Sequence, residues 1–248
     1  MSRVSVLDEA ALDQVSTARF QNATPYPWIN PAQLIHAQSY AALVKESPAL
    51  NLFHPVYGKK RAHGQTPHDR MVLEYDESLA VSDVWHQFVA ELKGPVYRAF
   101  LSRLLGKRQF ELSFHWHYTA TGCSVSPHCD ALYKLGSHIF YLNTQQDWEA
   151  SWGGETLILD DGHRFSPRSA PKFADFEHIY SGIALDNYSL LFARQSHSWH
   201  GVKPLQSPEG VYRKVFIVVI NDVLLMNYPR HIKPWLQKFA SLFKPCKR

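Results

Sequence analysis

The sequence predicts a mainly β protein in which N-terminal helices support an antiparallel β-sandwich or barrel. The character of the chain changes at Gln109, because helical patterns precede this residue and short strand patterns follow it as far as Asn221. Glycine and proline separate the strand patterns, which is typical of turns between strands. The chain has 248 residues and is 45% hydrophobic, so it can bury a sizeable core and fits a single domain.

Residues 1–108 form the predicted helical support. Asn30 and Pro31 fit the N-cap and the first position of a helix, and Gly94–Pro95 separates two further helices. A short strand is expected over residues 71–75. The expected helices cover residues 7–20, 30–47, 78–92 and 95–105.

Residues 109–221 form the predicted β core, so that residues 1–221 make one domain. Five apolar side chains at its start have the alternating period of a half-buried strand: Phe110, Leu112, Phe114, Trp116 and Tyr118. The further strands are expected over residues 137–143, 155–161, 189–194, 198–202 and 213–221.

Residues 222–248 are predicted to form a basic, amphipathic C-terminal helix. Between residues 234 and 243 apolar side chains recur at helical spacing, with lysines opposite. We expect this stripe to pack on the body of the protein or on a second copy in a homodimer, and peripheral membrane binding is the alternative.

The net charge of the chain is +4, and much of the excess lies in residues 58–70 and in the tail from Tyr228. Neither segment has the density of positive charge that nucleic-acid-binding arms have, so we expect no nucleic-acid partner. We interpret residues 58–70 as a solvated loop, with a clamp for an anionic substrate as the alternative.

Cysteine usage and apolar runs indicate the compartment. The three cysteines have no paired spacing, which favours a reducing environment. The N-terminus carries acidic residues from Asp8 onward, unlike a signal peptide. The longest apolar runs, such as residues 215–220, are too short to span a bilayer. We expect a cytoplasmic protein without a transmembrane segment.

His128 and Asp130 stand two residues apart, so both side chains leave one face of an extended strand. A His-x-Asp triplet is expected about 0.7 times by chance in such a chain, so the pair alone proves nothing. His200 supplies a third ligand from a second predicted strand. Two imidazoles and one carboxylate make the facial triad of non-haem Fe(II) oxygenases, which leaves positions open for chemistry. A closed structural zinc site would have four ligands, usually with cysteines.

Two residues beside these ligands have other interpretations. His197 precedes His200 by three residues and is the alternative third ligand. Cys129 lies between the first two ligands and is expected to point to the opposite side of the strand, as a small buried apolar group.

The remaining histidines near the site are interpreted as non-ligands. If the alternation holds, His115 and His117 face away from Tyr118 and are surface or structural residues. His138 is one residue from the predicted inward face and is interpreted as structural.

Four ordered segments, residues 117–130, 139–159, 189–204 and 212–222, resemble the prolyl-4-hydroxylase type of Fe(II)- and 2-oxoglutarate-dependent dioxygenase. This family includes the hypoxia-sensing prolyl hydroxylases. The resemblance covers about residues 112–222 and implies a double-stranded β-helix, or jelly roll, as the core of the fold. Its iron ligands would be His128, Asp130 and His200.

The resemblance also implies a co-substrate pocket. Arg213 would bind the distal carboxylate of 2-oxoglutarate, for which a guanidinium provides a bidentate fork. The pocket would be lined by Tyr118, Tyr141, Ile139 and Val202.

The spacing between the third ligand and this arginine departs from the family. Arg213 follows His200 by 13 positions, which is longer than usual, and the extra residues read as a lengthened turn. A longer turn preserves both strands, so we retain Arg213. Lys214 is the alternative, because a slip of one residue would turn it inward.

The activity that the resemblance implies is hydroxylation of an unactivated C–H bond. Fe(II), 2-oxoglutarate and O2 would be used, succinate and CO2 released, and ascorbate is a candidate additional cofactor. The expected substrate is a peptidyl, prolyl-type residue, and a small molecule or a sugar is the alternative. The rivals are a metal-binding barrel without oxygenase activity, which Arg213 and the tyrosines disfavour, and an inactive scaffold or a halogenase, which the complete triad disfavours.

Overall fold

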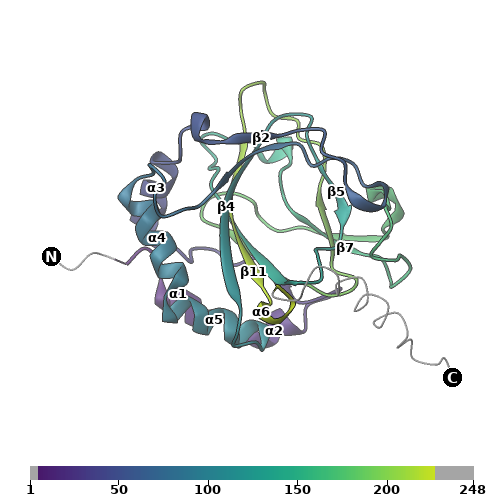
Figure 1. Ribbon diagram of the computed structural model, residues 1–248, viewed down its shortest axis with the longest axis horizontal. Coiled ribbons are helices and arrows are strands. Elements are labelled where there is room, and N and C mark those ends of the chain that lie inside the picture. The colour runs from purple at the N-terminus through teal and green to yellow at the C-terminus, as the bar shows by residue number, and fades with distance from the viewer. Residues whose placement is uncertain (1–4, 227–248) are drawn as a thin grey trace.

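The computed structural model describes residues 5–226. In Figure 1 the helices gather on one side, one set of strands lies beside them, and a second set lies on the far side. The helices are α1 (Glu9–Gln14), α2 (Thr17–Gln21), α3 (Ala37–Lys45), α4 (Asp83–Lys93), α5 (Pro95–Leu105) and α6 (Val223–Met226). Single 3-10 turns form η1 (Leu50–Leu52), η2 (Ala62–Gly64), η3 (Ala150–Trp152) and η4 (Phe173–Asp175).

Helices α4 and α5 support the sheet, and their ends follow from the sequence. Gly94 is extended between them, and Pro95 opens α5 at a position where a backbone N–H has no intrahelical partner. Gly106 ends α5 in the left-handed conformation, with φ 64°. Both helices were expected and are confirmed, although α4 begins later, at Asp83.

The N-terminal helices differ from the expectation. The segment 7–20 forms two short helices, α1 and α2, because Ser16 caps α2 through its side chain. Asn30 is not an N-cap, and α3 begins only at Ala37. Instead, the Asn30 side chain accepts a hydrogen bond from Ile183 N at 2.8 Å and donates one to Ser189 O at 2.8 Å. The chain is extended here because it pairs with a neighbouring strand.

The larger sheet has seven antiparallel strands in the described part of the chain, in the order β1–β9–β6–β11–β4–β3–β2. Its longest pairing joins the two nine-residue strands β4 and β11. The strands are β1 (Trp28–Ile29), β2 (His54–Val56), β3 (Arg70–Glu74), β4 (Glu111–Thr119), β6 (Lys134–Tyr141), β9 (Ser189–Ala193) and β11 (Arg213–Asn221).

The smaller sheet has four strands among the described residues, in the order β5–β10–β7–β8. They are β5 (Val125–His128), β10 (Trp199–Val202), β7 (Leu157–Asp160) and β8 (His178–Tyr180). The two sheets face each other, since Ile158 of β7 packs in one cluster with Ile139 and Val215 of the larger sheet. The fold is therefore mainly β with a jelly-roll core, as expected.

The larger sheet is buried on both faces. Trp116 and Phe216 face the helices, where their ring centroids lie 4.9 and 5.1 Å from that of Trp85 in α4. Ile139 and Val215 face the smaller sheet. A strand buried on two sides has no solvent-facing side, so its alternating pattern does not tell which side lines the interior.

All six strands expected between residues 109 and 221 are confirmed, and so is the strand near residues 71–75, which is β3. Two strands that were not expected, β1 and β2, also come from the first 108 residues and extend the larger sheet. These strands have two and three residues, too few for an alternating pattern.

The predicted C-terminal helix, with its homodimer contact, lies outside the described residues apart from α6. Within residues 5–226, no helix combines the length and the apolar character needed to cross a bilayer.

Candidate metal and co-substrate site

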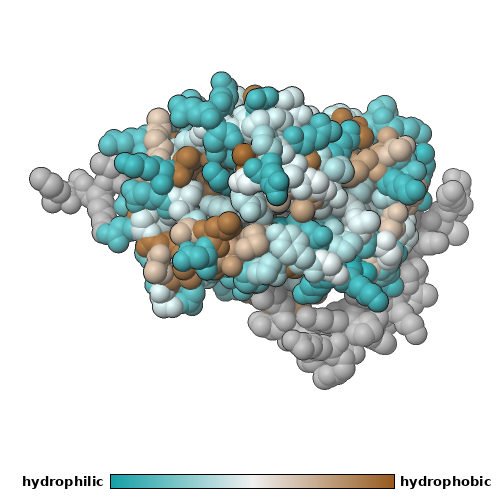
Figure 2. Space-filling model, turned by 90° about the horizontal axis from the view of Figure 1, so that it is seen from above, coloured by the Kyte–Doolittle hydropathy of each residue, from teal (hydrophilic) through white to brown (hydrophobic). Residues whose placement is uncertain are grey.

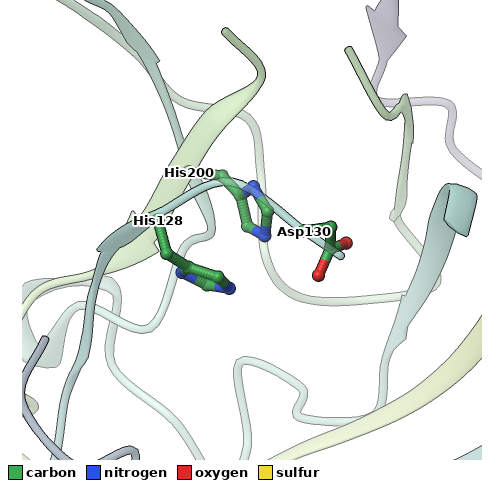
Figure 3. A group of neighbouring side chains, drawn as sticks. All are labelled: His128, Asp130 and His200. Carbon is green, nitrogen blue, oxygen red and sulfur yellow. The ribbon is translucent and has the colours of Figure 1, made fainter. Parts of the chain in front are cut away.

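The three predicted metal ligands come together at the edge of the smaller sheet (Figure 3). His128 ends β5 and His200 lies directly opposite it in β10, with ring centroids 4.3 Å apart. Asp130 follows β5 by two residues. The candidate ligand atoms of the three side chains lie within 4.8 Å of one another, so one ion can contact them all.

Both histidines offer a metal the same ring nitrogen. His128 Nδ1 lies 2.9 Å from Ser126 O, and His200 Nδ1 lies 3.0 Å from Ser198 O. A carbonyl only accepts, so each Nδ1–H donates and each Nε2 retains its lone pair. Burial lowers the pKa of both histidines, which keeps the imidazoles neutral, as a metal requires.

Asp130 is held as a carboxylate. Its Oδ1 accepts a hydrogen bond from Lys134 Nζ at 2.7 Å, and its Oδ2 accepts one from Ser137 Oγ at 3.4 Å. Burial alone would raise the pKa of Asp130, but Lys134 and the two histidines outweigh burial and lower it. Its backbone carbonyl accepts from Arg194 Nε at 3.2 Å, which fixes the segment after β5.

Arg213 provides a fixed cation in the interior, where it is only 7% exposed. Its Nε donates to Gly154 O, and its Nη2 donates to Thr156 Oγ1 at 3.1 Å. Its guanidinium carbon lies 5.7 Å from the ring centroid of Tyr141. Burial lowers the pKa of Arg213, and Tyr141 and Glu155 act in the opposite direction.

The apolar residues expected around the co-substrate lie on the inner faces of the two sheets. Ile139 and Tyr141 belong to the cluster between the sheets. Val202 is two residues beyond His200 on the same strand and packs with Trp148 and Leu205. The ring centroid of Phe192, in the same cluster as Tyr141, lies 4.5 Å from that of His200, and Tyr141 lies beside Arg213, so this cluster connects the triad with Arg213.

The position of Tyr118 corrects the sequence analysis. Its ring packs on Phe53, with centroids 4.3 Å apart, in the cluster under the helices. It pairs in register with Lys214, whereas His117 pairs with Val215. Tyr118 therefore points away from the interior, and we do not assign it to the pocket.

The same alternation turns His117 away from Tyr118, as expected, but toward the interior and not toward the surface. Burial lowers the pKa of His117 well below its usual value, with smaller contributions from Arg70, His115 and Arg213. The choice of inward face was wrong because both sides of β4 are covered.

The two alternatives, His197 for the third ligand and Lys214 for Arg213, have other partners, and His138 and Cys129 are not ligands. His197 Nδ1 lies 2.8 Å from Asp161 Oδ2, and Lys214 Nζ donates to Asp147 Oδ2 at 3.0 Å. His138 Nδ1 lies 2.7 Å from Tyr97 Oη beneath the helices. Cys129 packs against the outer cluster of the smaller sheet.

Several residues near the site escaped the sequence analysis. Thr156 and Lys134 contact Arg213 and Asp130, and no local pattern marks either. His68 packs on His128, and Arg61 and Arg70 lie near His68; all three belong to residues 58–70, where the concentration of basic residues was the available signal.

No family model matches the chain, and no curated protein matches it. Solved structures do. A Pseudomonas putida prolyl-4-hydroxylase is 16% identical with a TM-score of 0.59, over 86% of this chain and 98% of that one. A Trichoplax adhaerens prolyl hydroxylase, in complex with a hypoxia inducible factor peptide fragment, is 12% identical with a TM-score of 0.59, over 89% and 94%.

A third similar structure is the non-heme alpha ketoglutarate dependent epimerase SnoN from nogalamycin biosynthesis. It is 16% identical with a TM-score of 0.58, over 87% of this chain and 82% of that one. SnoN has also been solved in complex with Fe3+, alpha ketoglutarate and nogalamycin RO. The chain therefore has the fold of the prolyl-4-hydroxylase type of dioxygenase.

Proposed function

We propose that the protein is an Fe(II)- and 2-oxoglutarate-dependent dioxygenase that hydroxylates an unactivated C–H bond. The observation that carries this proposal is that the triad and the buried guanidinium of Arg213 border one cluster between the sheets, because Tyr141 beside Arg213 and Phe192 beside His200 both belong to it. Two neutral imidazoles and a carboxylate are the donor set that Fe(II) takes in oxygenases. A hydrolase or a sensor built on the same triad would have no need of a buried cation for a dicarboxylate.

The residues of the chain would bind and orient the reactants. His128, Asp130 and His200 would hold Fe(II), and Arg213 would pair with the distal carboxylate of 2-oxoglutarate. Its bonds to Gly154 and Thr156 fix the guanidinium in advance, so little freedom is lost on binding.

The walls of the pocket would exclude water. Ile139 and Val202 supply apolar surface, and the Tyr141 phenol lies beside the guanidinium. The bound iron and 2-oxoglutarate supply the oxidation itself, which consumes O2 and releases succinate and CO2. Ascorbate is the additional cofactor to test.

Two substrate classes have support. A peptidyl, prolyl-type residue is proposed first, because two of the similar structures are prolyl hydroxylases and one of them holds a peptide. A small molecule or sugar is the second candidate, because SnoN matches the fold equally well. The cysteine pattern supports the cytoplasm as the proposed compartment.

Anaerobic titration of the Fe(II) protein with 2-oxoglutarate tests the proposal, through the visible charge-transfer band of the chelate. The wild type should develop the band, form succinate in air and add 16 Da to a compound in cell extract. His200→Ala should lose the band and succinate formation. His197→Ala is the matched control and should retain both, because His197 is paired with Asp161. A wild type without the band would exclude the oxygenase.

A further inference from the structure

The segment between β2 and β3, residues 57–69, ends beside the metal triad. His68 Nε2 lies 3.1 Å from Ser126 Oγ in β5. The His68 ring meets the His128 ring edge-on, with centroids 4.8 Å apart. In Figure 1 this dark blue segment runs from β2 toward β5. The segment is therefore in contact with the site.

Two arginines of this region, Arg61 and Arg70, are partly buried, and the carboxylates that act on them, Asp130 and Asp69, do so without forming an ion pair. Arg61 Nε donates to Gln65 Oε1 at 3.2 Å, and Arg70 Nη1 donates to His68 O at 2.6 Å. Arg70 Nε is buried without a hydrogen-bond partner. Within residues 5–226, no carboxylate forms an ion pair with either arginine.

The two like charges affect each other. Burial lowers the pKa of Arg61 and the neighbouring Arg70 lowers it further, whereas Asp130 acts in the opposite direction. Two half-buried guanidinium groups without an ion-pairing carboxylate are costly, and an anion between them would relieve that cost.

The other cations of the site already have partners. Lys134 and Arg194 bond to the side chain and backbone of Asp130. If the site holds Fe(II) and 2-oxoglutarate as proposed, the positive charge of Fe(II) and Arg213 balances the negative charge of Asp130 and the 2-oxoglutarate dianion. Lys134 adds a further positive charge, so Asp130, which acts on Arg61, is already matched by other cations in the loaded site.

We propose that Arg61 and Arg70 form an oxyanion-binding subsite beside the triad, which takes a phosphate or carboxylate group of the substrate. The proposal rests on the proposed function and names the substrate class of the same site. Guanidinium groups bind both oxyanions through paired hydrogen bonds. An anion bound there would anchor the substrate next to the iron ligands, and neutral analogues would bind poorly. Seen from above in Figure 2, the surface carries many hydrophilic residues interspersed with hydrophobic patches.

Calorimetric titration of two probes, methyl phosphate and acetate, tests the subsite. The protein is loaded with Mn(II) and saturated with 2-oxoglutarate under nitrogen, at constant ionic strength, so that binding is measured without turnover. The wild type should bind at least one probe. Relaxation of the phosphorus-31 signal by Mn(II) should locate bound phosphate near the metal, and binding of one probe alone identifies the oxyanion.

Matched variants of this region test which residues bind the probe. Arg61→Gln should weaken binding of the probe about tenfold or more, because a charge-assisted hydrogen bond is lost. Lys60→Gln removes the same charge from an exposed position one residue away and should change affinity less than about threefold. Arg70→Gln should weaken binding too, and its melting curve checks the fold, since Arg70 also holds His68.

Three results would overturn the proposal. The first is that the wild type binds neither probe. The second is that Arg61→Gln and Lys60→Gln weaken probe binding equally. The third is that the arginine variants lose affinity for 2-oxoglutarate by the same factor as for the probe. The anaerobic charge-transfer band separates the two proposals. A band without probe binding would remove the subsite alone, and probe binding without a band would remove the oxygenase alone.

Discussion

Arg213 and Lys214 are adjacent in the sequence, yet β11 directs them to opposite faces of the larger sheet. Arg213 reaches Thr156 in the interior, whereas Lys214 reaches Asp147 and pairs in register with Tyr118. This alternation assigns the candidate clamp for 2-oxoglutarate to a single residue.

Arg213→Ala should weaken the binding of 2-oxoglutarate steeply. An unpaired carboxylate in a confined apolar pocket costs about 2–5 kcal/mol, or roughly 30- to 5000-fold in affinity. The measurement is the anaerobic titration of the Fe(II) protein, in which iron binding to the triad should stay near normal.

Two further variants separate the effect of charge from that of geometry and check the register of β11. Arg213→Lys should recover part of the loss, because the charge remains without the bidentate geometry. Lys214→Ala is the matched control and should bind 2-oxoglutarate as the wild type does. A loss confined to Lys214→Ala would mean that β11 is displaced by one residue from the register described.

At the scale of the element, Gly201 determines how closely β10 approaches its neighbours. A Cβ atom at this position would lie 2.6 Å from Val125 O of β5 and 2.9 Å from Phe173 Cζ. The strand therefore needs glycine beside His200 in order to keep that ligand opposite His128.

Gly201→Ala should separate β5 from β10 and disturb the triad without removing a ligand. We expect a fall in iron affinity of about 10- to 100-fold, together with a loss of about 1–3 kcal/mol in the free energy of unfolding. Metal titration and thermal melting measure the two effects. Lys203→Ala, at an exposed residue just beyond β10, should change neither. Normal iron affinity in Gly201→Ala would show that β10 can shift without moving His200.

The elements also show how much the sequence could predict. Long strands such as β4 and β11 carry an apolar period. The triad was predictable from the His-x-Asp pair, a third histidine on another strand and the family resemblance, although Asp130 itself lies beyond the end of β5. The short β1 and β8 carry too few residues for a pattern. The interior face of β4 was not predictable, because Tyr118 and His117 are both covered and only the tertiary arrangement distinguishes them.

For the whole molecule, buried histidines link stability to pH. Burial lowers the pKa of His138 to about 3, and His117, His128 and His200 are shifted in the same direction. An unfolded histidine binds a proton near pH 6.5, whereas the folded ones do so only at lower pH. The contribution to stability is therefore complete above about pH 6.5 and is lost as the pH falls toward the folded pKa.

The free energy of unfolding of the metal-free protein should thus fall steeply between pH 6.5 and 4.5. Each buried histidine contributes a slope of up to about 1.4 kcal/mol per pH unit. His138→Leu should reduce the slope by about that amount in chemical denaturation at several pH values. His54→Leu, at an exposed residue of β2, is the control. An identical slope in His138→Leu and the wild type would contradict the assignment.

The pairing of His128 with His200 has a consequence for the kinetics of the fold. In the described part of the chain, β5 is an edge strand that pairs only with β10, and edge strands open locally at little cost. A metal ion held by both strands would cross-link them, because β5 could not separate from β10 without breaking a coordination bond. Amide hydrogen exchange should show this directly. Metal should slow exchange over residues 125–128 far more than at the centre of β11, which pairs on both sides and opens only with the whole domain. Equal slowing of both strands would mean that the ion stabilises the domain as a whole and does not close this edge. If the ion cross-links β5 and β10 in this way, the rate at which β5 opens would limit how quickly the protein releases its iron.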